Sequence, residues 1–429
     1  MTPTPAALRG PPIPTSAVVA TVLGNALEFY DFTTYAFFAV MIGRVFFPTH
    51  DPFVSLLLSV AAFGVGFLTR PLGGIVIGAY ADRAGRKPAM MLSIGLMALG
   101  MVLLAATPSY ASIGLAAPIL VVLARLIQGF ALGGEVGPAT SYLLEAAPPH
   151  KRGQYVAWQI ASQGAAAVLA GALGVAMSLL LDADQMQSWG WRIPFFVGIA
   201  IVPVGLIMRR QLEETVDLHA GTTHSTAGRV LAALLRHHTR ALVLALMLVT
   251  SGTIATYIGV YMTTYALTTL HMPTGVSMSA TLVVGIFTML FSLIGGWLAD
   301  RVGRKPIYLA SKLSLTAVAY PAFVMINRHH TFSALLLMSA LIAALIALGS
   351  VALVVIPECF PKSVRSAGLS TAYAVAVTVF GGTTQIVVTW LIHATGDPLS
   401  PAWYLIGSCM IGIAAILLIP ETKDAALAD

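Results

Sequence analysis

The chain has 429 residues, of which 58% are hydrophobic and 9% are charged, and its formal net charge at pH 7 is +6. A soluble domain carries about 25% charged residues, so this composition excludes a protein whose whole surface faces water. Segments inside a bilayer satisfy their backbone groups as helices or as closed barrels. The apolar runs have helical length and do not alternate, so we predict an all-α membrane protein. We attribute the positive charge to basic loops, not to nucleic-acid binding.

Twelve apolar spans follow one another along the chain, and each is long enough to cross a bilayer as a helix. The fourth, fifth and eleventh spans are rich in glycine, which is typical of closely packed membrane helices. The spans lie at roughly 17–44, 53–81, 88–108, 112–146, 153–181, 191–210, 240–269, 276–299, 306–327, 332–357, 364–393 and 401–420.

A charged loop occurs twice and divides the chain into two halves. Residues 78–88 and 296–306 both read G-x-x-x-D-R-x-G-R-K-P, 218 positions apart. We therefore expect two six-helix pseudo-symmetric bundles, at 1–210 and 240–429, joined by a polar cytoplasmic linker at 211–239. Parallel halves of six helices are the layout of one large class of transporters.

The basic residues predict the orientation in the membrane. If both termini are cytoplasmic, seventeen of the 23 lysines and arginines fall in inner loops and tails, and only Arg44, Arg192 and Arg328 fall outside. Cytoplasmic loops carry an excess of such residues. We therefore expect a multi-pass protein of the inner (cytoplasmic) membrane with both termini in the cytoplasm.

Acidic and basic residues recur together on that cytoplasmic side. Beside the two repeated loops, Glu145 precedes Arg152 by seven positions, and Glu358 precedes Arg365 by the same spacing. We predict a latch that holds the halves together on the inner side and breaks when they rock; the alternative is that these charges only set the topology. The predicted gating residues are Asp82, Arg83, Arg86, Glu145, Arg152, Asp300, Arg301, Arg304, Glu358 and Arg365.

Two carboxylates lie inside the first span. A charge at mid-bilayer costs about 2.5–3.5 kcal/mol on insertion scales, so such residues are functional candidates by default. Glu28 and Asp31 are three positions apart and share one helical face. Two carboxylates this close, outside bulk water, do not both ionise easily, which suits a proton carrier. The alternative is a structural pair neutralised by Arg70 or Arg125.

The fourth span holds Arg125, Gln128 and Glu135. A guanidinium does not lose its proton in proteins, so Arg125 must be paired in every state. Its candidate partners are a carboxylate of the first span, Glu135 or a bound anion, and competition among them couples proton to substrate. The alternative is a permanent buried ion pair. The predicted proton-coupling residues are Glu28, Asp31, Arg125 and Glu135.

Hydroxyl and amide groups dominate the remaining polar positions within the spans. Such donors suit a carboxylate that must be oriented without permanent binding; the alternative is interhelical hydrogen bonding. We expect Arg70 to be mainly structural and Lys312 to extend its ammonium group to the inner surface. The predicted substrate-binding residues are Asn25, Tyr35, Arg125, Gln128, Gln159, Gln163, Tyr257, Tyr261, Tyr373 and Gln385.

These motifs resemble a known family. The doubled loop and the repeat of six spans look like the major facilitator superfamily, over essentially the whole chain. Residues 24–32, 70–74 and 125–135 resemble its metabolite:H+ symporter family. Residues 373–396 are similar to the eleventh helix of the citrate and tricarballylate proton symporters, although Gln385 stands where those symporters usually have proline. The resemblance implies proton-coupled transport by alternating access.

We therefore predict a secondary active transporter, a symporter that moves protons together with a small carboxylate, with citrate or a related tricarboxylate as the best candidate. Alternative cargoes are a dicarboxylate, an aromatic acid, or a zwitterion such as proline or betaine; a remote alternative is a membrane sensor that transports nothing. We expect no enzyme, because no nucleophile, metal or cofactor constellation is visible, and no ATP-driven pump, because the phosphate-loop motif is missing. The expected partners are substrate, protons and lipid, with the monomer as the functional unit.

Overall fold

The structure is a computed structural model, and it describes residues 15–84, 86–134, 136–210, 234–361 and 364–423. Helices account for almost all of this. In the N-terminal half they are α1 (Thr15–Phe37), α2 (Ala39–Phe46), α3 (Pro52–Val65), η1 (Gly66–Thr69), α4 (Arg70–Ala84), α5 (Arg86–Ala106), α6 (Tyr110–Ile113), α7 (Ala116–Ala131), η2 (Leu132–Gly134), α8 (Val136–Ala146), η3 (Pro149–Lys151), α9 (Arg152–Leu180), α10 (Ala183–Ser188), η4 (Gly190–Arg192) and α11 (Ile193–Arg210).

The C-terminal half repeats this series of long helices. The second span of this half is one unbroken helix, α14. The fourth span is interrupted by the short 3₁₀ turn η5, and the fifth by the short π-helical turn η6. The elements are α13 (Thr239–Thr268), α14 (Thr274–Val302), α15 (Arg304–His329), α16 (Phe332–Leu348), η5 (Gly349–Val351), α17 (Ala352–Glu358), α18 (Arg365–Ala376), η6 (Val377–Gly381), α19 (Gly382–Thr395) and α20 (Ser400–Leu417).

Many of these helices are long and apolar enough to span a membrane. In the part of the chain that the structure describes, nine helices are long and apolar enough to cross a bilayer, and the stretches Ala116–Ala131 and Gly190–Pro203 are shorter apolar helices. The first predicted span corresponds to α1 and α2, and the fourth to α7, η2 and α8, so breaks in the helix shorten some spans.

Side-chain caps begin several elements at the end of the bundle that carries α6 and α10. Asp51 accepts a hydrogen bond from the Phe53 backbone N–H at 2.8 Å and starts α3. Asp182 and Gln185 form a capping box at α10, and Thr331 caps α16. Such oxygens satisfy N–H groups that have no partner within the helix. The chain therefore turns back into the bundle at defined residues.

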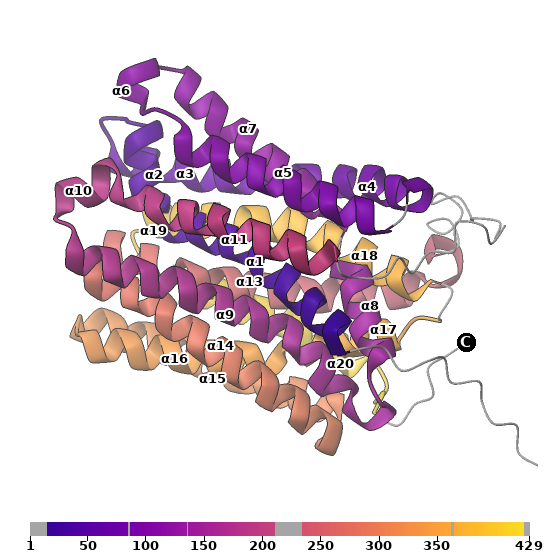
Figure 1. The fold of residues 1–429 in the computed structure, drawn as a ribbon. Coiled ribbons are helices and arrows are strands. Elements are labelled where there is room, and N and C mark those ends of the chain that lie inside the picture. Colours follow the sequence, from indigo (N-terminus) through magenta and orange to yellow (C-terminus); the bar gives the residue numbers. More distant parts are fainter. Residues whose placement is uncertain (1–14, 85, 135, 211–233, 362–363, 424–429) are drawn as a thin grey trace, which may run out of the picture.

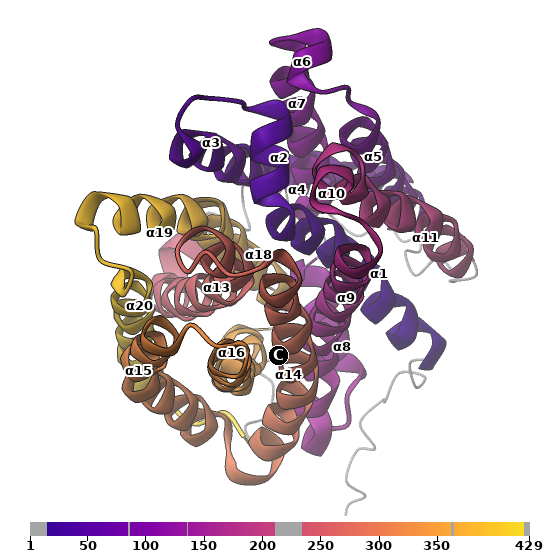
Figure 2. The same cartoon turned by 90° about the vertical axis from the view of Figure 1, so that its left-hand side faces the viewer.

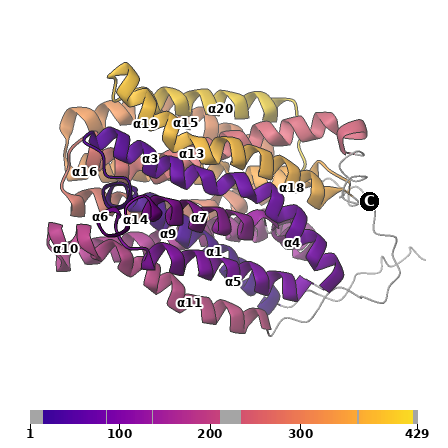
Figure 3. The same ribbon diagram turned by 90° about the horizontal axis from the view of Figure 1, so that it is seen from above.

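The two halves lie side by side along a common long axis (Figure 1). Seen from one end, the C-terminal half packs against the N-terminal half through α14, which runs beside α9, and through α19, which approaches α3 (Figure 2). The view from above shows α3 and α19 adjacent again (Figure 3). The repeated stretches 78–88 and 296–306 are mostly helical: they include the ends of α4 and α14 and the starts of α5 and α15, at one end of the bundle that we call the basic end.

Glycine allows α9 and α14 to approach closely. A Cβ atom on Gly296 would lie 2.5 Å from the Gly153 carbonyl oxygen, and one on Gly164 would lie 2.5 Å from the Met289 backbone nitrogen. A real Cβ does not come so near to a backbone atom, so these positions require glycine. This seam brings the two halves into direct backbone contact along most of α9.

Candidate functional site

Asp31 and Arg125 form an ion pair between α1 and α7. Arg125 Nη1 lies 3.0 Å from Asp31 Oδ2, and neither side chain is exposed. The same Nη1 donates a hydrogen bond to Gln128 Oε1, one turn along α7, at 2.5 Å. Asp31 Oδ1, Arg125 Nε and Nη2, and Gln128 Nε2 have no hydrogen-bond partner among the described residues. The pair therefore retains buried donors and an acceptor that a further ligand can use.

Aromatic rings surround this arginine. The Arg125 Cζ atom lies 4.5 Å from the ring centroid of Tyr35, 4.7 Å from that of Phe32 and 5.4 Å from that of Phe63. Tyr257, from α13 of the other half, packs edge-on against Phe63 with the ring centroids 6.0 Å apart. Rings attract a cation through their quadrupole, and here they also exclude water from the ion pair.

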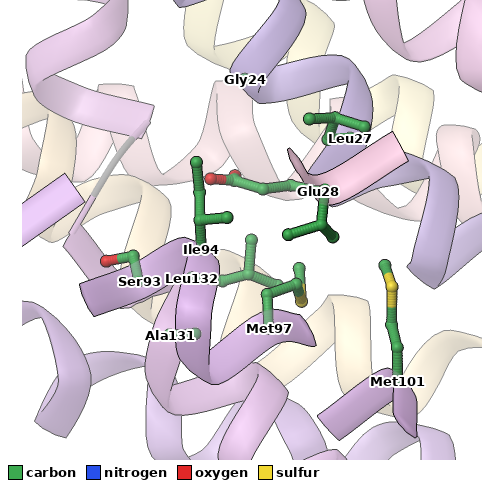
Figure 4. A pocket seen from close by; sticks show the side chains of 10 residues that line it. Gly24, Leu27, Glu28, Ser93, Ile94, Met97, Met101, Ala131 and Leu132 are labelled. Atoms are coloured by element: carbon green, nitrogen blue, oxygen red, sulfur yellow. The ribbon is translucent and has the colours of Figure 1, made fainter. Parts of the chain in front are cut away.

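Glu28 faces a different environment, one turn before Asp31 on α1. It is 7% exposed and lines a small pocket with Ser93 and Met97 of α5 and Leu132 of η2, as the close-up in Figure 4 shows. Within the described part of the chain, no hydrogen bond or ion pair involves its carboxyl group. The pocket holds about 20 Å³, enough for roughly one water molecule. The structure therefore separates the surroundings of the two carboxylates that the sequence places on one face.

Several predicted substrate-binding residues instead connect helices. Asn25 donates hydrogen bonds of 2.8 Å to the Gln159 carbonyl oxygen and to Ser162 Oγ. Gln159 Oε1 accepts from Thr140 Oγ1 at 2.5 Å, while its Nε2 has no partner among the described residues. Tyr35 donates to a carbonyl oxygen of α3 at 3.2 Å. These contacts match the interhelical alternative, and Gln163, also on α9, is half-buried.

The predicted substrate-binding residues of the C-terminal half have fewer hydrogen-bond partners among the described residues. The hydroxyl of Tyr261 accepts a hydrogen bond from Thr389 of α19 at 2.9 Å. Tyr257 is buried and packs on the aromatic rings of the other half, and Tyr373 on α18 is half-buried. Gln385 is 1% exposed, and neither its Oε1 nor its Nε2 has a partner among the described residues. A buried amide without partners is rare, so Gln385 stands out as a group available to a ligand.

At the basic end, each glutamate pairs with an arginine of the opposite half. Arg365 Nη1 lies 3.2 Å from Glu145 Oε1, and Arg152 Nη1 lies 4.0 Å from Glu358 Oε1. Asp300 accepts from the backbone N–H groups of Gly153 and Gln154 at 2.8 and 2.9 Å, at the start of α9. Each arginine therefore reaches the acid of the other half, whereas the seven-residue spacing left open which acid meets which arginine.

The tail completes this cluster, which the sequence reading did not include. Glu421 accepts backbone hydrogen bonds from Arg304 and Lys305 at 2.9 and 3.0 Å, and Thr422 donates to Glu358 at 2.5 Å. Burial by itself raises the pKa of the Glu421 carboxyl, but the backbone N–H groups together hold that pKa below its usual value. The available signal was the position of Glu421 at the end of the repeat, matching Glu214 in the first half.

Arg304 joins the cluster, and Arg301 does not. Arg304 Nη2 lies 3.4 Å from Asp300 Oδ1 and 3.3 Å from Glu358 Oε1. The Arg301 guanidinium lies over the Trp297 ring, 4.1 Å from its centroid, and its carbonyl oxygen accepts from Lys423. We call the contacts of Glu145, Arg152, Asp300, Arg304, Glu358, Arg365 and Glu421 the latch.

Of two further basic residues within the spans, Lys312 departs from its predicted role. Lys312 does not extend to the surface: it is 1% exposed, with Nζ 5.5 Å from the Tyr308 ring centroid. Its side chain lies beside η5, because a Cβ atom on Gly349 would lie 3.5 Å from Lys312 Cε. Arg70 is 6% exposed and has no carboxylate partner in the described ranges. The side chains of four predicted residues lie outside the described residues: Asp82, Arg83, Arg86 and Glu135.

Comparison with known proteins assigns the chain to a family. The model of the family "Sugar (and other) transporter" matches residues 16–238 and again residues 208–429. The chain belongs to this family of the major facilitator superfamily. It is a multi-pass membrane transporter, not an enzyme.

Relatives and solved structures agree with that assignment. The chain is 38% identical to the citrate-proton symporter of Klebsiella pneumoniae over 96% of this chain and 93% of that protein. It is 32% identical to the proline/betaine transporter of Salmonella typhimurium over 95% of this chain and 84% of that protein. The crystal structure of D-xylose-proton symporter superposes with a TM-score of 0.75 at 19% identity, covering 95% of this chain and 98% of that chain. This last likeness shows the twelve-helix fold.

Proposed function

We propose that this transporter is a proton symporter for a small carboxylate, with citrate or a related tricarboxylate as the best candidate. The observation that carries the proposal is the fully buried pair of Asp31 and Arg125, whose remaining polar atoms have no partner in the described part of the chain. Breaking a buried pair by neutralising one member leaves an uncompensated charge. A proton on Asp31 therefore creates an immediate need for another anion at Arg125.

Coupling follows from that requirement. While Asp31 is ionised, it occupies Arg125 Nη1 at 3.0 Å. Once Asp31 is protonated, Arg125 keeps its charge and binds a substrate carboxylate in its place, with Gln128 beside it. Glu28, one turn away in its water-sized pocket, is the candidate for passing the proton to this region. Proton and substrate thus enter together, because protonation of Asp31 leaves the Arg125 charge without a partner and the substrate carboxylate neutralises that charge.

Alternating access needs an element that opens and closes between the halves. We infer that residues 1–210 and 240–429 move as two units, and that the latch opens when the cytoplasmic side opens. Two of its ion pairs, Arg365–Glu145 and Arg152–Glu358, join opposite halves, so separation of the halves breaks them. The excess of basic residues supports an orientation with the latch and both termini in the cytoplasm, in the inner membrane. Residues 211–233 of the predicted linker lie outside the described residues.

Reconstituted vesicles test this function. Wild-type protein is expected to accumulate labelled citrate when a pH gradient is imposed and not when a proton ionophore dissipates it. Glu28→Gln and Asp31→Asn are expected to abolish gradient-driven accumulation. Full accumulation by both variants, or wild-type uptake that ignores the gradient, contradicts the proposal.

A second candidate is a zwitterion, because the chain also aligns with proline/betaine transporters over most of its length. The same vesicles discriminate the two: excess unlabelled proline or betaine reduces citrate uptake only if it enters the same site. Gradient-driven uptake of labelled proline in place of citrate would establish the second candidate.

A further inference from the structure

Arg70 is a second buried guanidinium at the contact between the halves. It begins α4 directly after the 3₁₀ turn η1 and is 6% exposed. Its Nε atom has no hydrogen-bond partner, and no carboxylate in the described ranges pairs with the side chain. Arg125, in contrast, has Asp31 at 3.0 Å. Among the described residues of the N-terminal half, the Arg125 guanidinium is therefore neutralised by a carboxylate and the Arg70 guanidinium is not.

The two guanidinium groups are close neighbours. The Cζ atoms of Arg70 and Arg125 each lie 4.7 Å from the ring centroid of Phe32, so they are no farther apart than twice that distance. Arg70 also lies 4.3 Å from the Phe67 ring centroid. Such contacts with rings contribute roughly 0.5–2 kcal/mol, whereas burying an ion costs several kcal/mol. Aromatic rings alone do not compensate Arg70.

A tyrosine of the opposite half lies near this arginine, because Arg70 and Tyr257 of α13 both pack against the Phe67 ring. The aromatic ring of Tyr257 packs on Phe67 with centroids 5.7 Å apart, which places the α13 residue beside η1. Tyrosine hydroxyls donate hydrogen bonds to carboxylates. The Tyr257 hydroxyl is thus the candidate donor from the other half for an anion bound at Arg70.

We propose that Arg70 is the permanent anchor for one substrate carboxylate, and that Arg125 receives a second carboxylate only when Asp31 is protonated. This inference rests on the proposed function and specifies its substrate class. With Asp31 ionised, the three side chains carry a net charge of one; with Asp31 protonated, they carry two. A substrate with at least two ionised carboxylates matches the protonated state, whereas a zwitterion places its cationic group beside excess positive charge.

The test uses the full-length protein purified in detergent, with citrate, succinate and proline as probes in calorimetric titrations. Arg70→Gln is expected to raise the citrate Kd at least tenfold, since a hydrogen bond to a charged group is lost. Arg70→Lys keeps the charge without the planar fork and is expected to fall between wild type and Arg70→Gln. Arg44→Gln removes a cation from an exposed position on α2 and is the matched control, with unchanged affinity.

The outcomes separate a binding role from a structural one. A structural role predicts a lower unfolding temperature of the ligand-free Arg70→Gln protein at an unchanged citrate Kd, and that result overturns the inference. If Arg70→Gln does not fold, Arg70→Lys decides: an unchanged citrate Kd refutes the anchor, and a raised one supports it. Tighter binding of proline than of citrate by wild-type protein also refutes it.

The proposed function can fail separately. If wild-type vesicles accumulate no carboxylate under a pH gradient, the proposed symport is refuted before any Arg70 variant is considered. If wild-type vesicles accumulate citrate and Arg70→Gln vesicles do so with the same KM, only the role of Arg70 is refuted. Loss of citrate accumulation in Arg70→Gln at normal yield in the membrane supports both.

Discussion

Replacing Asp31 with asparagine removes the charge of the buried pair while keeping the shape. The 3.0 Å contact joins two side chains with no exposure, so solvent does not screen the change. Removing one member of such a pair costs about 3–5 kcal/mol. Asparagine retains an oxygen that accepts from Arg125, and hydrogen bonds to charged groups contribute about 1.5–3 kcal/mol. The expected loss of folding free energy is therefore about 2 kcal/mol.

The double variant Asp31→Asn/Arg125→Gln sharpens this prediction. Because it removes the uncompensated charge, it is expected to be more stable than Asp31→Asn, by roughly 1 kcal/mol. Denaturant titration of the purified proteins in one detergent measures all three differences. Asp184→Asn, at an exposed position of α10, is the control and is expected to match wild type. A double variant less stable than Asp31→Asn would refute the reasoning.

Transport gives an independent measurement on the same proteins. A neutral residue at position 31 mimics the protonated carboxyl, so Asp31→Asn is expected to exchange substrate in counterflow without accumulating it against a gradient. Wild type performs both. An Asp31→Asn protein that accumulates citrate as wild type does contradicts the coupling role of the pair.

Further perturbations address the latch and the seam. Glu145→Arg is expected to weaken closure of the latch, and the added change Arg365→Glu is expected to restore it. The rate at which a cysteine placed beneath the latch is labelled measures closure. Gly296→Leu is expected to destabilise the protein by about 1–3 kcal/mol through overpacking of the seam, measured by denaturant titration. The stabilising contribution of Glu421 is present above the pKa of the unfolded carboxyl and is lost as the pH falls through the lower folded pKa. The difference in unfolding temperature between wild type and Glu421→Gln is thus expected to persist near neutrality and to decline once the pH falls below the unfolded glutamate pKa of about 4.3.

Local sequence signals predicted the helical architecture well. Apolar length marked α13, α14 and α15 as spans, because lipid leaves the backbone no other partners than its own helix. The repeated loops predicted two related halves, and the family match confirms the transporter class. Short breaks such as η2 and η5 were not predicted, since hydropathy averaged over many residues does not register a single turn.

The site was predicted as a set of residue types and not as an arrangement. Arg125 was expected to find a carboxylate, and the choice of Asp31 over Glu28 depends on which side of α1 faces α7 and which faces the pocket beside α5. A separation of three residues leaves this choice open, because the two side chains are offset around the helix by about 60°. Lys312 was misjudged for a related reason: its access to the surface depends on the helices packed over it.

The sequence by itself determined the membrane setting, the duplication and the presence of costly charges inside the spans, because these follow from composition and from periodicity along one chain. Tertiary structure decided which charges are paired. It brought Asp31 to Arg125, 94 positions away in the sequence. It paired Glu145 with Arg365 and Glu358 with Arg152, each across the two halves, and it left Arg70 without a carboxylate in the described ranges. Ion pairing depends on distances of a few ångströms between helices, and the packing of side chains that sets these distances involves residues far apart in the chain.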